Sequence, residues 1–496
     1  MTLNKGSLLL NSGQRLFVIA VLFLSGLSLL AIWYPRFPAM QDYPQHLFTA
    51  YVISTFEGGI FNWSDYYYIE DSAGPYSLFF LIVVPLAKLL PIEIAGKVYI
   101  SLVLGLIVAL VFVWNFAREK DYPSWSLLLL FPVFFSQMYY MGFTNYLISI
   151  PILFFILFVH ERVTFESINK YMAAAYLLLM CALFLSHPYS ILVYIVLASA
   201  ISICNRKNKV YFYKSLVGPL VAAIIFVLWY VATFSNLSAL MQGEMDRQWL
   251  PLNFVLGFFV MPLFGMRMGI GIDYITAFGW VLITAIYVYA WHNSKAVPRA
   301  KSPVKIMLLL TISGYLILPF YFNDYSYFNL RMSLVCYFLI ALALGNIKLG
   351  RNPSFIMIML VTGLMLQIIN TQVKLSGETE ELLPLLDQME INSAVYTIYE
   401  NASANAIDRE YFYQFHSHDH FYYHTLVGGG VTPKLFPSKM NRVKFKDGIT
   451  MPDIAAAPHL YRYILVRGEG DSSRTIQASH TLKASSASWS LYERHL

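Results

Sequence analysis

Long apolar runs separated by short polar loops fill most of the chain. A helix needs about 20 apolar residues to cross a hydrocarbon core about 30 Å thick, and about eleven runs approach that length. The predicted membrane helices are 16–34, 96–117, 124–141, 145–160, 171–187, 189–204, 213–235, 274–292, 304–322, 331–347 and 354–371. Two more apolar stretches, 76–91 and 251–266, are broken or flanked by proline, so each could cross the membrane or lie in its interface.

The charged loops favour an interfacial position for both of these stretches. If both remain on the outer side, loops rich in arginine and lysine alternate with acidic or nearly neutral loops, as the positive-inside rule requires. The loops that then face the cytoplasm contain Arg118 and Lys120, Arg162 and Lys170, and the basic residues of 206–214, 295–305 and 348–351. This alternation predicts a cytoplasmic N-terminus and an extracytoplasmic C-terminal region.

The composition of the chain changes near residue 371. Residues 372–496 carry charges throughout and contain only short strand-like runs, 394–399, 461–466 and 489–492, with a helix predicted over 378–389. We therefore predict an all-α polytopic membrane domain over 1–371, whose first outer loop is 35–95. A small extracytoplasmic α/β domain is predicted over 372–496.

Composition supports a membrane protein and excludes other classes. Of the 496 residues, 58% are hydrophobic and only 12% are charged, whereas soluble proteins carry roughly 25% charged residues. The net charge of +6 is spread over short loops and forms no continuous stripe, which argues against nucleic-acid binding. The three cysteines lie in or beside apolar runs without a CxxC pair, so neither disulfides nor thiolate metal sites are indicated.

The first outer loop contains the most informative polar stretch, Met40-Gln41-Asp42-Tyr43-Pro44-Gln45-His46-Leu47. Asp42 and His46 are spaced i, i+4 and would share one face of a helix that starts here. A structural interpretation also fits, because Asp42 with Gln45 resembles a capping box and Pro44 suits a first helical turn. The two interpretations are compatible, since a carboxylate held at a helix start is also well oriented.

This layout resembles the GT-C superfamily of membrane glycosyltransferases, which includes protein O-mannosyltransferases, lipid A aminoarabinose transferases and bacterial transferases of envelope polysaccharides. The resemblance consists of an acidic residue soon after the first helix, the proline-flanked stretch 76–91, a second crossing that ends in Arg118-Glu119-Lys120, and a soluble outer tail. The chain has Asp42-Tyr43-Pro44-Gln45-His46 where several members have an Asp-Glu pair, so the resemblance is one of architecture.

The resemblance implies transfer of a sugar from a polyprenyl-phosphate donor, with inversion at the anomeric carbon. A phosphate leaves without a general acid, so the enzyme must supply a base for the acceptor hydroxyl, and by resemblance this base is Asp42. The developing phosphate charge needs a cation, for which Arg331 is the candidate because a guanidinium can donate two N–H groups to phosphate. The alternatives for Arg331 are a snorkelling anchor or a salt bridge to Asp324.

Four further polar residues are candidate substrate-binding groups: His46, His187, Asn145 and Arg247. His187 could orient Asp42 or contact the sugar, but a histidine before a proline more often hydrogen-bonds freed carbonyl groups. Asn145 could simply cap the outer end of its helix. Arg247 and Arg267 flank 251–266 and could contact either phosphate or lipid headgroups.

The predicted outer tail contains the histidine-rich stretch His416-Ser417-His418-Asp419-His420, followed by His424. Alternating histidines on a strand face one side, so His416, His418 and His420 are candidate ligands for a divalent metal such as zinc or copper. A loop of this composition could equally contact carbohydrate or cover the site. No other cofactor is predicted.

The sequence thus predicts a glycosyltransferase of the plasma (bacterial inner) membrane that acts at its outer face. Its partners would be a lipid-linked sugar donor, a glycan, lipid or protein acceptor, and the bilayer itself. One alternative is a transporter or flippase for a lipid-linked saccharide, although transporters tend to place polar residues at mid-membrane and often contain inverted repeats. The other alternative is a non-catalytic envelope assembly protein whose tail binds a partner.

Overall fold

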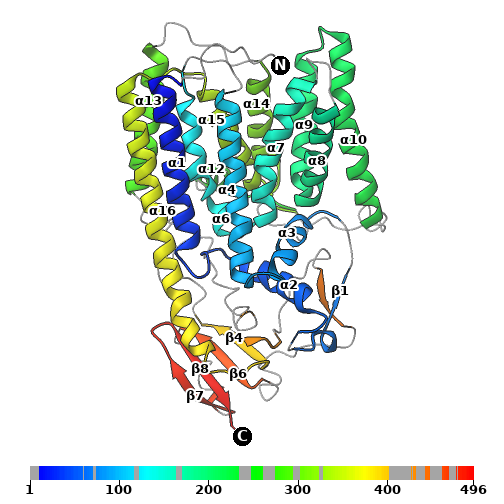
Figure 1. Cartoon of the computed structure of the whole chain (residues 1–496), viewed down its shortest axis with the longest axis vertical. Coiled ribbons are helices and arrows are strands. Elements are labelled where there is room, and N and C mark those ends of the chain that lie inside the picture. The colour runs from blue at the N-terminus through cyan, green and yellow to red at the C-terminus, as the bar shows by residue number, and fades with distance from the viewer. Residues whose placement is uncertain are drawn as a thin grey trace.

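The structure is a computed structural model and describes most of the chain. The described residues are 10–59, 61–70, 74–116, 122–163, 170–233, 247–260, 274–293, 302–322, 328–400, 426, 428–431, 442–446, 461–468, 476–477 and 479–495. They form a bundle of roughly parallel helices, with the N-terminal end of the chain at one end and a small sheet at the other (Figure 1).

Helices coincide with every apolar run that the sequence predicts. The long and medium helices are α1 (Ser12–Trp33), α4 (Ile92–Phe116), α7 (Thr144–Val163), α8 (Lys170–Ser186), α9 (Pro188–Cys204), α10 (Lys209–Thr233), α13 (Tyr274–Asn293), α14 (Ser302–Ile317), α15 (Leu330–Leu344) and α16 (Arg351–Leu386). Five of the described helices, α1, α4, α7, α10 and α16, are long and apolar enough to cross a membrane. The total of about eleven crossings remains a prediction.

The predicted run 124–141 is not one continuous helix. It consists of the 3-10 helix η2 (Trp125–Leu129) and the short helices α5 (Leu130–Phe134) and α6 (Gln137–Tyr140). Nearly all of its side chains are buried among the neighbouring helices. Irregular backbone is tolerated at membrane depth only where protein surrounds it, which explains why a broken segment can occupy this central position.

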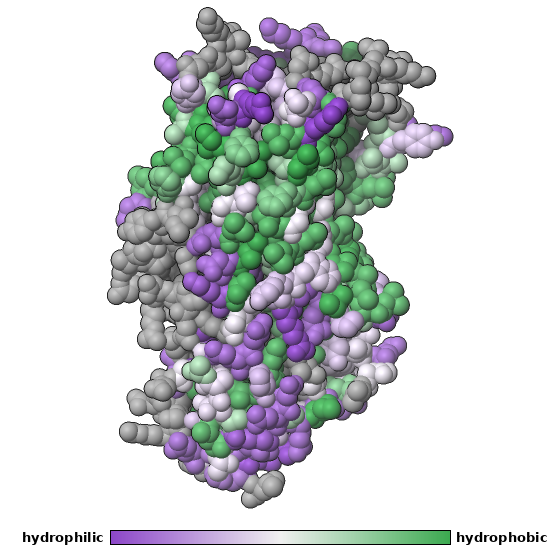
Figure 2. Space-filling view, turned by 60° about the vertical axis from the view of Figure 1, so that its left-hand side comes forward, coloured by the Kyte–Doolittle hydropathy of each residue, from purple (hydrophilic) through white to green (hydrophobic). Residues whose placement is uncertain are grey.

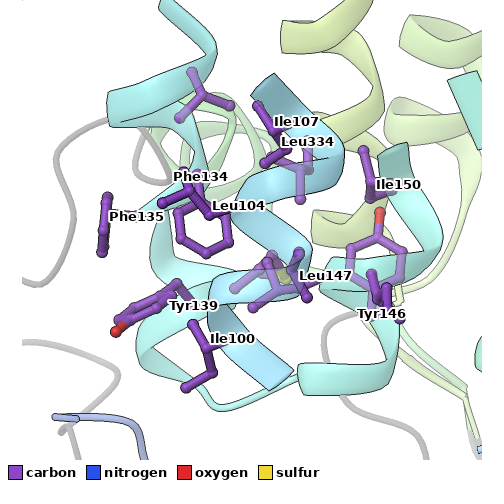
Figure 3. Close-up of a cluster of buried hydrophobic side chains, with 14 of the residues drawn as sticks. Ile100, Leu104, Ile107, Phe134, Phe135, Tyr139, Tyr146, Leu147, Ile150 and Leu334 are labelled. Carbon is purple, nitrogen blue, oxygen red and sulfur yellow. The ribbon is translucent and has the colours of Figure 1, made fainter. Parts of the chain in front are cut away.

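The centre of the bundle is a cluster of large apolar side chains. Figure 3 shows Ile100, Leu104 and Ile107 of α4 beside Phe134, Phe135 and Tyr139 of the broken segment, with Leu147 of α7 and Leu334 of α15 close by. In water, fully burying one such side chain stabilises a fold by about 1.5–3 kcal/mol. Between membrane helices, it is the close packing of such side chains that holds the helices in place. This cluster fixes the ends of α7 and α15 relative to α4.

The first outer loop folds into short elements on the side of the bundle opposite the N-terminus (Figure 1). They are α2 (Tyr43–Thr55), η1 (Trp63–Asp65), β1 (Tyr67–Ile69) and α3 (Leu78–Ala87). The ten residues of α3 extend only about 15 Å, half the thickness of a hydrocarbon core. α3 is therefore too short to cross, as the loop charges predicted for 76–91. The described helix within 251–266 is α12 (Leu252–Val260), nine residues long.

α16 links the bundle to the C-terminal sheet. It continues to Leu386 without interruption, so the predicted domain boundary at residues 371 and 372 falls inside a helix. Beyond it, β4 (Val395–Tyr399), β6 (Tyr463–Arg467), β8 (Trp489–Arg494) and β7 (His480–Ser485) form a four-stranded sheet in that order. β4 and β6 are parallel, and the other pairs are antiparallel. The predicted strands are confirmed.

The C-terminal region also reaches back to the first outer loop. β5 (Val443–Phe445) pairs antiparallel with β1, with Tyr67 opposite Phe445. A third small sheet joins β2 (Arg247–Gln248) to β3 (Tyr321–Phe322). The residues predicted as a separate soluble domain thus share a sheet with a loop of the predicted membrane domain.

The surface of the bundle is suited to lipid. Figure 2 shows hydrophobic residues covering the helical part and hydrophilic residues gathered towards its two ends. Many large apolar side chains are exposed there, including Leu178 (70%), Leu228 (65%) and Val281 (64%). Such a belt would be insoluble in water but is readily wetted by lipid chains. The chain is a multi-pass membrane protein.

Candidate functional site

Asp42 lies where the chain leaves α1 and enters α2. The connecting segment is held by Lys97 of α4, whose Nζ donates hydrogen bonds to the carbonyl oxygens of Trp33 (3.3 Å) and Pro35 (2.5 Å). An ion pair between Arg36 and Glu93 (3.3 Å) adds to this anchorage. The N-terminal end of α4 therefore holds the segment that leads to Asp42.

A tight turn on the opposite side supports the Asp42 backbone. The amide of Asp42 donates to the carbonyl of Met141 (3.2 Å), and the preceding amide donates to Tyr140 (2.7 Å). Gly142 in this turn has φ +77°, and a Cβ added to it would lie 2.7 Å from the backbone nitrogens of both Asp42 and Tyr43. Only glycine allows this close approach.

The side chain of Asp42 does not cap α2. Asp42 is the N-cap residue, but its carboxylate accepts no hydrogen bond from the first turn. The side-chain nitrogen of Gln45, Nε2, is buried without a hydrogen-bond partner. The capping box that the sequence allowed is therefore not formed, whereas Pro44 does occupy the first turn. The carboxylate remains available for another role.

The surroundings of Asp42 favour the protonated carboxyl more than water does. Burial raises the pKa of Asp42 from its ordinary 3.8 to about 7, and the positive charge of Arg331 opposes part of this increase. The residue is nevertheless partly exposed. A carboxyl that is enclosed by protein, yet open on one side and titrating near neutrality, has the properties of a general base.

Arg331 lies in the first turn of α15 and carries a guanidinium with few partners. The residue is 7% exposed, its Nε is buried without a hydrogen-bond partner, and its Cζ lies 5.0 Å from the centre of the Phe143 ring. Within the described ranges it forms no ion pair. A buried unpaired cation is costly unless an anion binds to it.

Tyr76 completes the surroundings of Arg331 and was not predicted from the sequence. Its backbone has φ +67°, a strained value for a tyrosine. Its amide donates to the Ser186 carbonyl (3.2 Å). Burial raises the pKa of Tyr76 to about 12, although the charge of Arg331 lowers it. The Gly74-Pro75 pair before it was the available sequence signal, since such a dipeptide marks a turn.

Asn145 holds this strained turn in place. Its Oδ1 accepts a hydrogen bond from the amide of Phe79 in the first turn of α3 (3.1 Å), and its Nδ2 donates to the Tyr76 carbonyl (3.3 Å). Asn145 therefore satisfies a free amide at the start of α3, not of its own helix α7. Its predicted contact with substrate remains a prediction, while the contacts here position Tyr76.

His187 caps α9 and also faces Tyr76. Its Nδ1 accepts a hydrogen bond from the Tyr189 amide (3.2 Å), and its ring centre lies 4.7 Å from that of Tyr76. Burial, followed by the charge of Arg331, holds the pKa of His187 well below its usual range. The ring is therefore neutral, and because Nδ1 is an acceptor, the proton resides on Nε2. This bond to an amide differs from the expected one to freed carbonyl groups. Contact of His187 with Asp42 or with the sugar stays a prediction.

His46 lies one turn beyond Asp42 on α2. Its ring packs 5.6 Å from that of Phe79 and 6.5 Å from that of Phe80, both in α3. Burial lowers the pKa of His46 to about 4, so the imidazole is neutral at physiological pH. In a substrate site it would donate or accept a hydrogen bond and would not act as a cation.

Arg442 brings the C-terminal region to the same loop and was also not predicted. Its guanidinium donates to Ser77 Oγ (2.8 Å) and lies 5.7 Å from the centre of the Phe80 ring. Its carbonyl accepts a hydrogen bond from the Glu70 amide (2.8 Å). Ser77 directly follows the strained Tyr76, so Arg442 fixes the side of the turn opposite Asn145.

The remaining candidates are placed less fully. Arg247 lies in β2, where its backbone pairs with Phe322 of β3, the strand that precedes α15 in the chain. Arg267 and the tail histidines His416, His418, His420 and His424 lie outside the described residues. Among the described residues there is no group of three or more His, Cys, Asp or Glu that could hold a metal ion.

The fold and these positions together define a class of membrane protein. A bundle of apolar helices carries two short helices after its first span, an acidic residue at the start of the first short helix, and a sheet on the same side. This is a GT-C-like fold, so the resemblance noted in the sequence is confirmed at the level of the fold.

Two solved structures carry this comparison. ArnT from Cupriavidus metallidurans, an aminoarabinose transferase, aligns in its apo state with a TM-score of 0.58 over 97% of this chain and 98% of that chain, at 9% identity. The structure of ArnT bound to undecaprenyl phosphate aligns with a TM-score of 0.54 over 96% and 97%, also at 9% identity. Neither a protein-family model nor a curated protein matched the sequence. The similarity therefore concerns the fold.

Proposed function

We propose that this protein is an inverting glycosyltransferase that transfers a sugar from a polyprenyl-phosphate donor. The observation that carries the proposal is the pair formed by Asp42 and Arg331. The Asp42 carboxylate caps no helix and titrates near neutrality, and the neighbouring guanidinium has a buried Nε without a partner. A base and a cation that has no ion-pair partner among the described residues match the two requirements of this reaction.

The proposed reaction displaces phosphate from the sugar in one step. An acceptor hydroxyl attacks the anomeric carbon while its proton passes to the Asp42 carboxylate. The bond between the anomeric carbon and the phosphate oxygen breaks, and the electron pair leaves with the polyprenyl phosphate. Attack from the face opposite the leaving group inverts the anomeric centre. A base with a pKa of about 7 is both deprotonated and sufficiently basic at neutral pH.

Arg331 would stabilise the charge that develops on the leaving phosphate. Its Nε is buried and unpartnered, and its ring contact with Phe143 restricts the side chain. A preorganised cation requires little reorganisation during the reaction, which is why such groups contribute strongly to catalysis. ArnT has been solved with undecaprenyl phosphate bound, and this supports a lipid phosphate as the ligand here.

Asp42 and Arg331 are separated enough to act on different parts of the substrate. Their charges interact, but they form no ion pair within 4 Å in the described chain. A direct ion pair would neutralise both groups and lower the pKa of the carboxyl. In the proposed reaction, the reacting carbon would lie between base and cation.

The site lies on the side of the bundle that carries the C-terminal sheet, opposite the N-terminus (Figure 1). With the topology predicted from the basic loops, this is the outer face of a bacterial inner membrane. The acceptor would be an envelope glycan, lipid or protein. The C-terminal residues 372–496 would form the outer domain that covers this face, and β5 already pairs with the first outer loop.

Analysis of cell envelopes tests the function and separates it from its alternatives. Mass spectrometry would show which glycan modification is missing from cells without the protein. We expect cells that produce Asp42→Asn to lack the same modification. Asp65→Asn is the matched control, because Asp65 belongs to the same loop and its side chain accepts a hydrogen bond from neighbouring Asn62 (2.8 Å). It should restore the modification. If the protein were a scaffold, Asp42→Asn would leave the modification intact. If it were a flippase, cells without it would accumulate a lipid-linked precursor on the inner leaflet. Either result would overturn the proposal.

A further inference from the structure

A cavity lies between α8 and α10 at the edge of the bundle. It has a volume of about 520 Å³ and is bounded mainly by apolar side chains. Several of its wall residues are also exposed on the outer surface, among them Leu177 (64%), Val217 (57%) and Val221 (45%). The cavity is therefore a crevice that opens sideways where lipid surrounds the helices. Figure 1 shows α10 as the outermost helix here.

One end of this crevice is basic. Lys214 of α10 lines the cavity itself, and Arg206, Lys207 and Lys209 precede it in the connection from α9, all of them exposed. In the described part of the chain these four side chains form no ion pair with an acidic group. A long lysine stem can follow the apolar wall while its ammonium reaches the membrane surface.

Hydrogen-bonding groups lie about one turn of α10 beyond Lys214. His160 and Tyr176 both line the crevice, and Nδ1 of His160 lies 3.2 Å from the Tyr176 hydroxyl. The Tyr176 hydroxyl in turn hydrogen-bonds the Tyr194 hydroxyl. A Cβ at Gly218 of α10 would lie 2.0 Å from the Tyr176 oxygen. The absence of a side chain at position 218 lets α10 pass directly over this polar row.

We propose that the crevice binds an anionic glycerophospholipid, with an acyl chain along its apolar wall and the phosphate at Lys214. The occupant must be apolar along most of its length, because the wall is. It must be negatively charged at one end, because the cations there form no ion pair with any acidic group of the described residues. Basic pockets between membrane helices bind anionic headgroups for this reason. The polar row of His160 and Tyr176 offers partners for the ester region of such a lipid.

This lipid site is distinct from the proposed catalytic site. α9 has its first residue beside His187 and its last residue, Cys204, beside the basic connection. Its 17 residues separate the two ends by about 25 Å. The basic end of the crevice therefore lies about one length of α9 from His187, whereas its apolar wall extends to Leu185 and Ile191 near His187. The site would hold the phosphate of a membrane lipid at the end away from Asp42.

Binding of defined lipids to the purified, delipidated protein tests this proposal. Native mass spectrometry would compare phosphatidylglycerol with zwitterionic phosphatidylethanolamine. We expect tighter binding of phosphatidylglycerol, a loss of about fivefold in its affinity for Lys214→Gln, and no change for phosphatidylethanolamine. Lys305→Gln is the matched control, because Lys305 is also an exposed lysine in the N-terminal part of its helix, α14, but lies outside the crevice.

A crevice-filling variant and a cross-linking readout complete the test. Val221→Trp should abolish the preference for phosphatidylglycerol. In the wild-type protein, a photoreactive phosphatidylglycerol should label residues 173–185 of α8 and 214–225 of α10. Equal affinity for both lipids, or labelling elsewhere, overturns the proposal. Displacement of phosphatidylglycerol by undecaprenyl phosphate at equal concentration would also overturn it, because the occupant would then be a polyprenyl carrier.

Discussion

Asp42 illustrates how the role proposed for one residue can carry a cost in stability. Its carboxylate gains no helix-capping bond, and burial raises its pKa to about 7. A carboxyl with a raised folded-state pKa binds its proton more tightly in the folded protein than in the unfolded chain. Its ionisation therefore opposes folding, by an amount that is absent well below pH 3.8 and complete above about pH 7. Such an unfavourable arrangement is typical of a functional site.

The cost gives a prediction about stability. In the absence of substrate at pH 8, Asp42→Asn should melt at the same temperature as the wild-type protein or higher, because the buried charge is removed and no capping bond is lost. At pH 5 the difference should shrink. Thermal unfolding in detergent measures both values. A marked loss of stability at pH 8 would show that the carboxylate holds the structure together.

The same pKa predicts the pH dependence of activity. A base must be deprotonated, so kcat/KM should fall about tenfold per pH unit below about pH 7 and level off above it. Arg331 lowers the pKa of Asp42, so Arg331→Gln should move this limb to higher pH as well as reduce the rate. Arg351→Gln serves as control, because Arg351 is an exposed arginine at the start of α16. A pH-independent rate would argue against Asp42 as the base.

At the scale of elements, the site depends on two turns that the helices carry at their ends. The Gly142 turn supports the backbone of Asp42, and the strained Tyr76 turn is held by Asn145 and by Arg442 through Ser77. The Gly142 turn leads into α7, which belongs to the central apolar cluster, and the Tyr76 turn is bonded to Asn145 of the same helix. We therefore expect the elements of the bundle to determine where the proposed base lies relative to Arg331.

Gly142→Ala tests the first of these turns. The added methyl would lie 2.7 Å from two backbone nitrogens of the Asp42 segment, so Asp42 must move, and a displacement of about 1 Å can reduce the rate about 100-fold. Gly58→Ala is the matched control, because Gly58 also has positive φ (+89°) but has nothing within 4 Å. We expect both variants to lose some stability and only Gly142→Ala to lose activity. Equal activities would mean that the turn does not position Asp42.

At the scale of the whole molecule, the C-terminal region contacts the loop that carries the proposed site. Arg442 contacts Ser77 and Phe80 of the first outer loop, and β5 pairs with β1. Phe80 in turn packs against His46. The C-terminal region thus acts on the loop from a sequence distance of more than 350 residues.

Arg442→Gln tests this contribution. The variant loses the cation over Phe80 and weakens the bond to Ser77, so we expect a several-fold fall in kcat/KM with the fold retained. Arg462→Gln is the control, because Arg462 belongs to the same region but pairs with Glu390 on the sheet, away from the loop. Steady-state kinetics and thermal unfolding of both variants would distinguish a positioning role from general destabilisation. Identical behaviour of the two variants would remove Arg442 from the site.

The sequence was sufficient for the elements that depend on local pattern. Apolar runs predicted the helices, the proline-flanked stretch 76–91 proved too short to cross, and the strand-like runs of the tail formed strands. The prominence of Asp42 and Arg331 also followed from residue type and from the resemblance to GT-C proteins. What could not be predicted were contacts between distant segments. Tyr76, Gly142 and Arg442 matter only because three parts of the chain meet there, and a sequence pattern does not contain that meeting.

The capping box shows a second limit. Asp42 and Gln45 have the spacing of that motif, yet the carboxylate does not cap the helix. The Asp42 backbone is fixed instead by the Met141 carbonyl and the Gly142 turn. Tertiary contacts therefore override the local motif, as they often do where a residue serves a reaction.

Transfer and donor binding, measured side by side on purified Asp42→Asn, test the central claim most directly. The protein would be assayed for sugar transfer from polyprenyl-phosphate sugars and, separately, for binding of undecaprenyl phosphate. Loss of the base should lower transfer by about 10²–10⁴-fold, while undecaprenyl phosphate binds as well as before or better, because a negative charge near the phosphate is gone. Transfer at the wild-type rate by Asp42→Asn would contradict the assignment of Asp42 as the base.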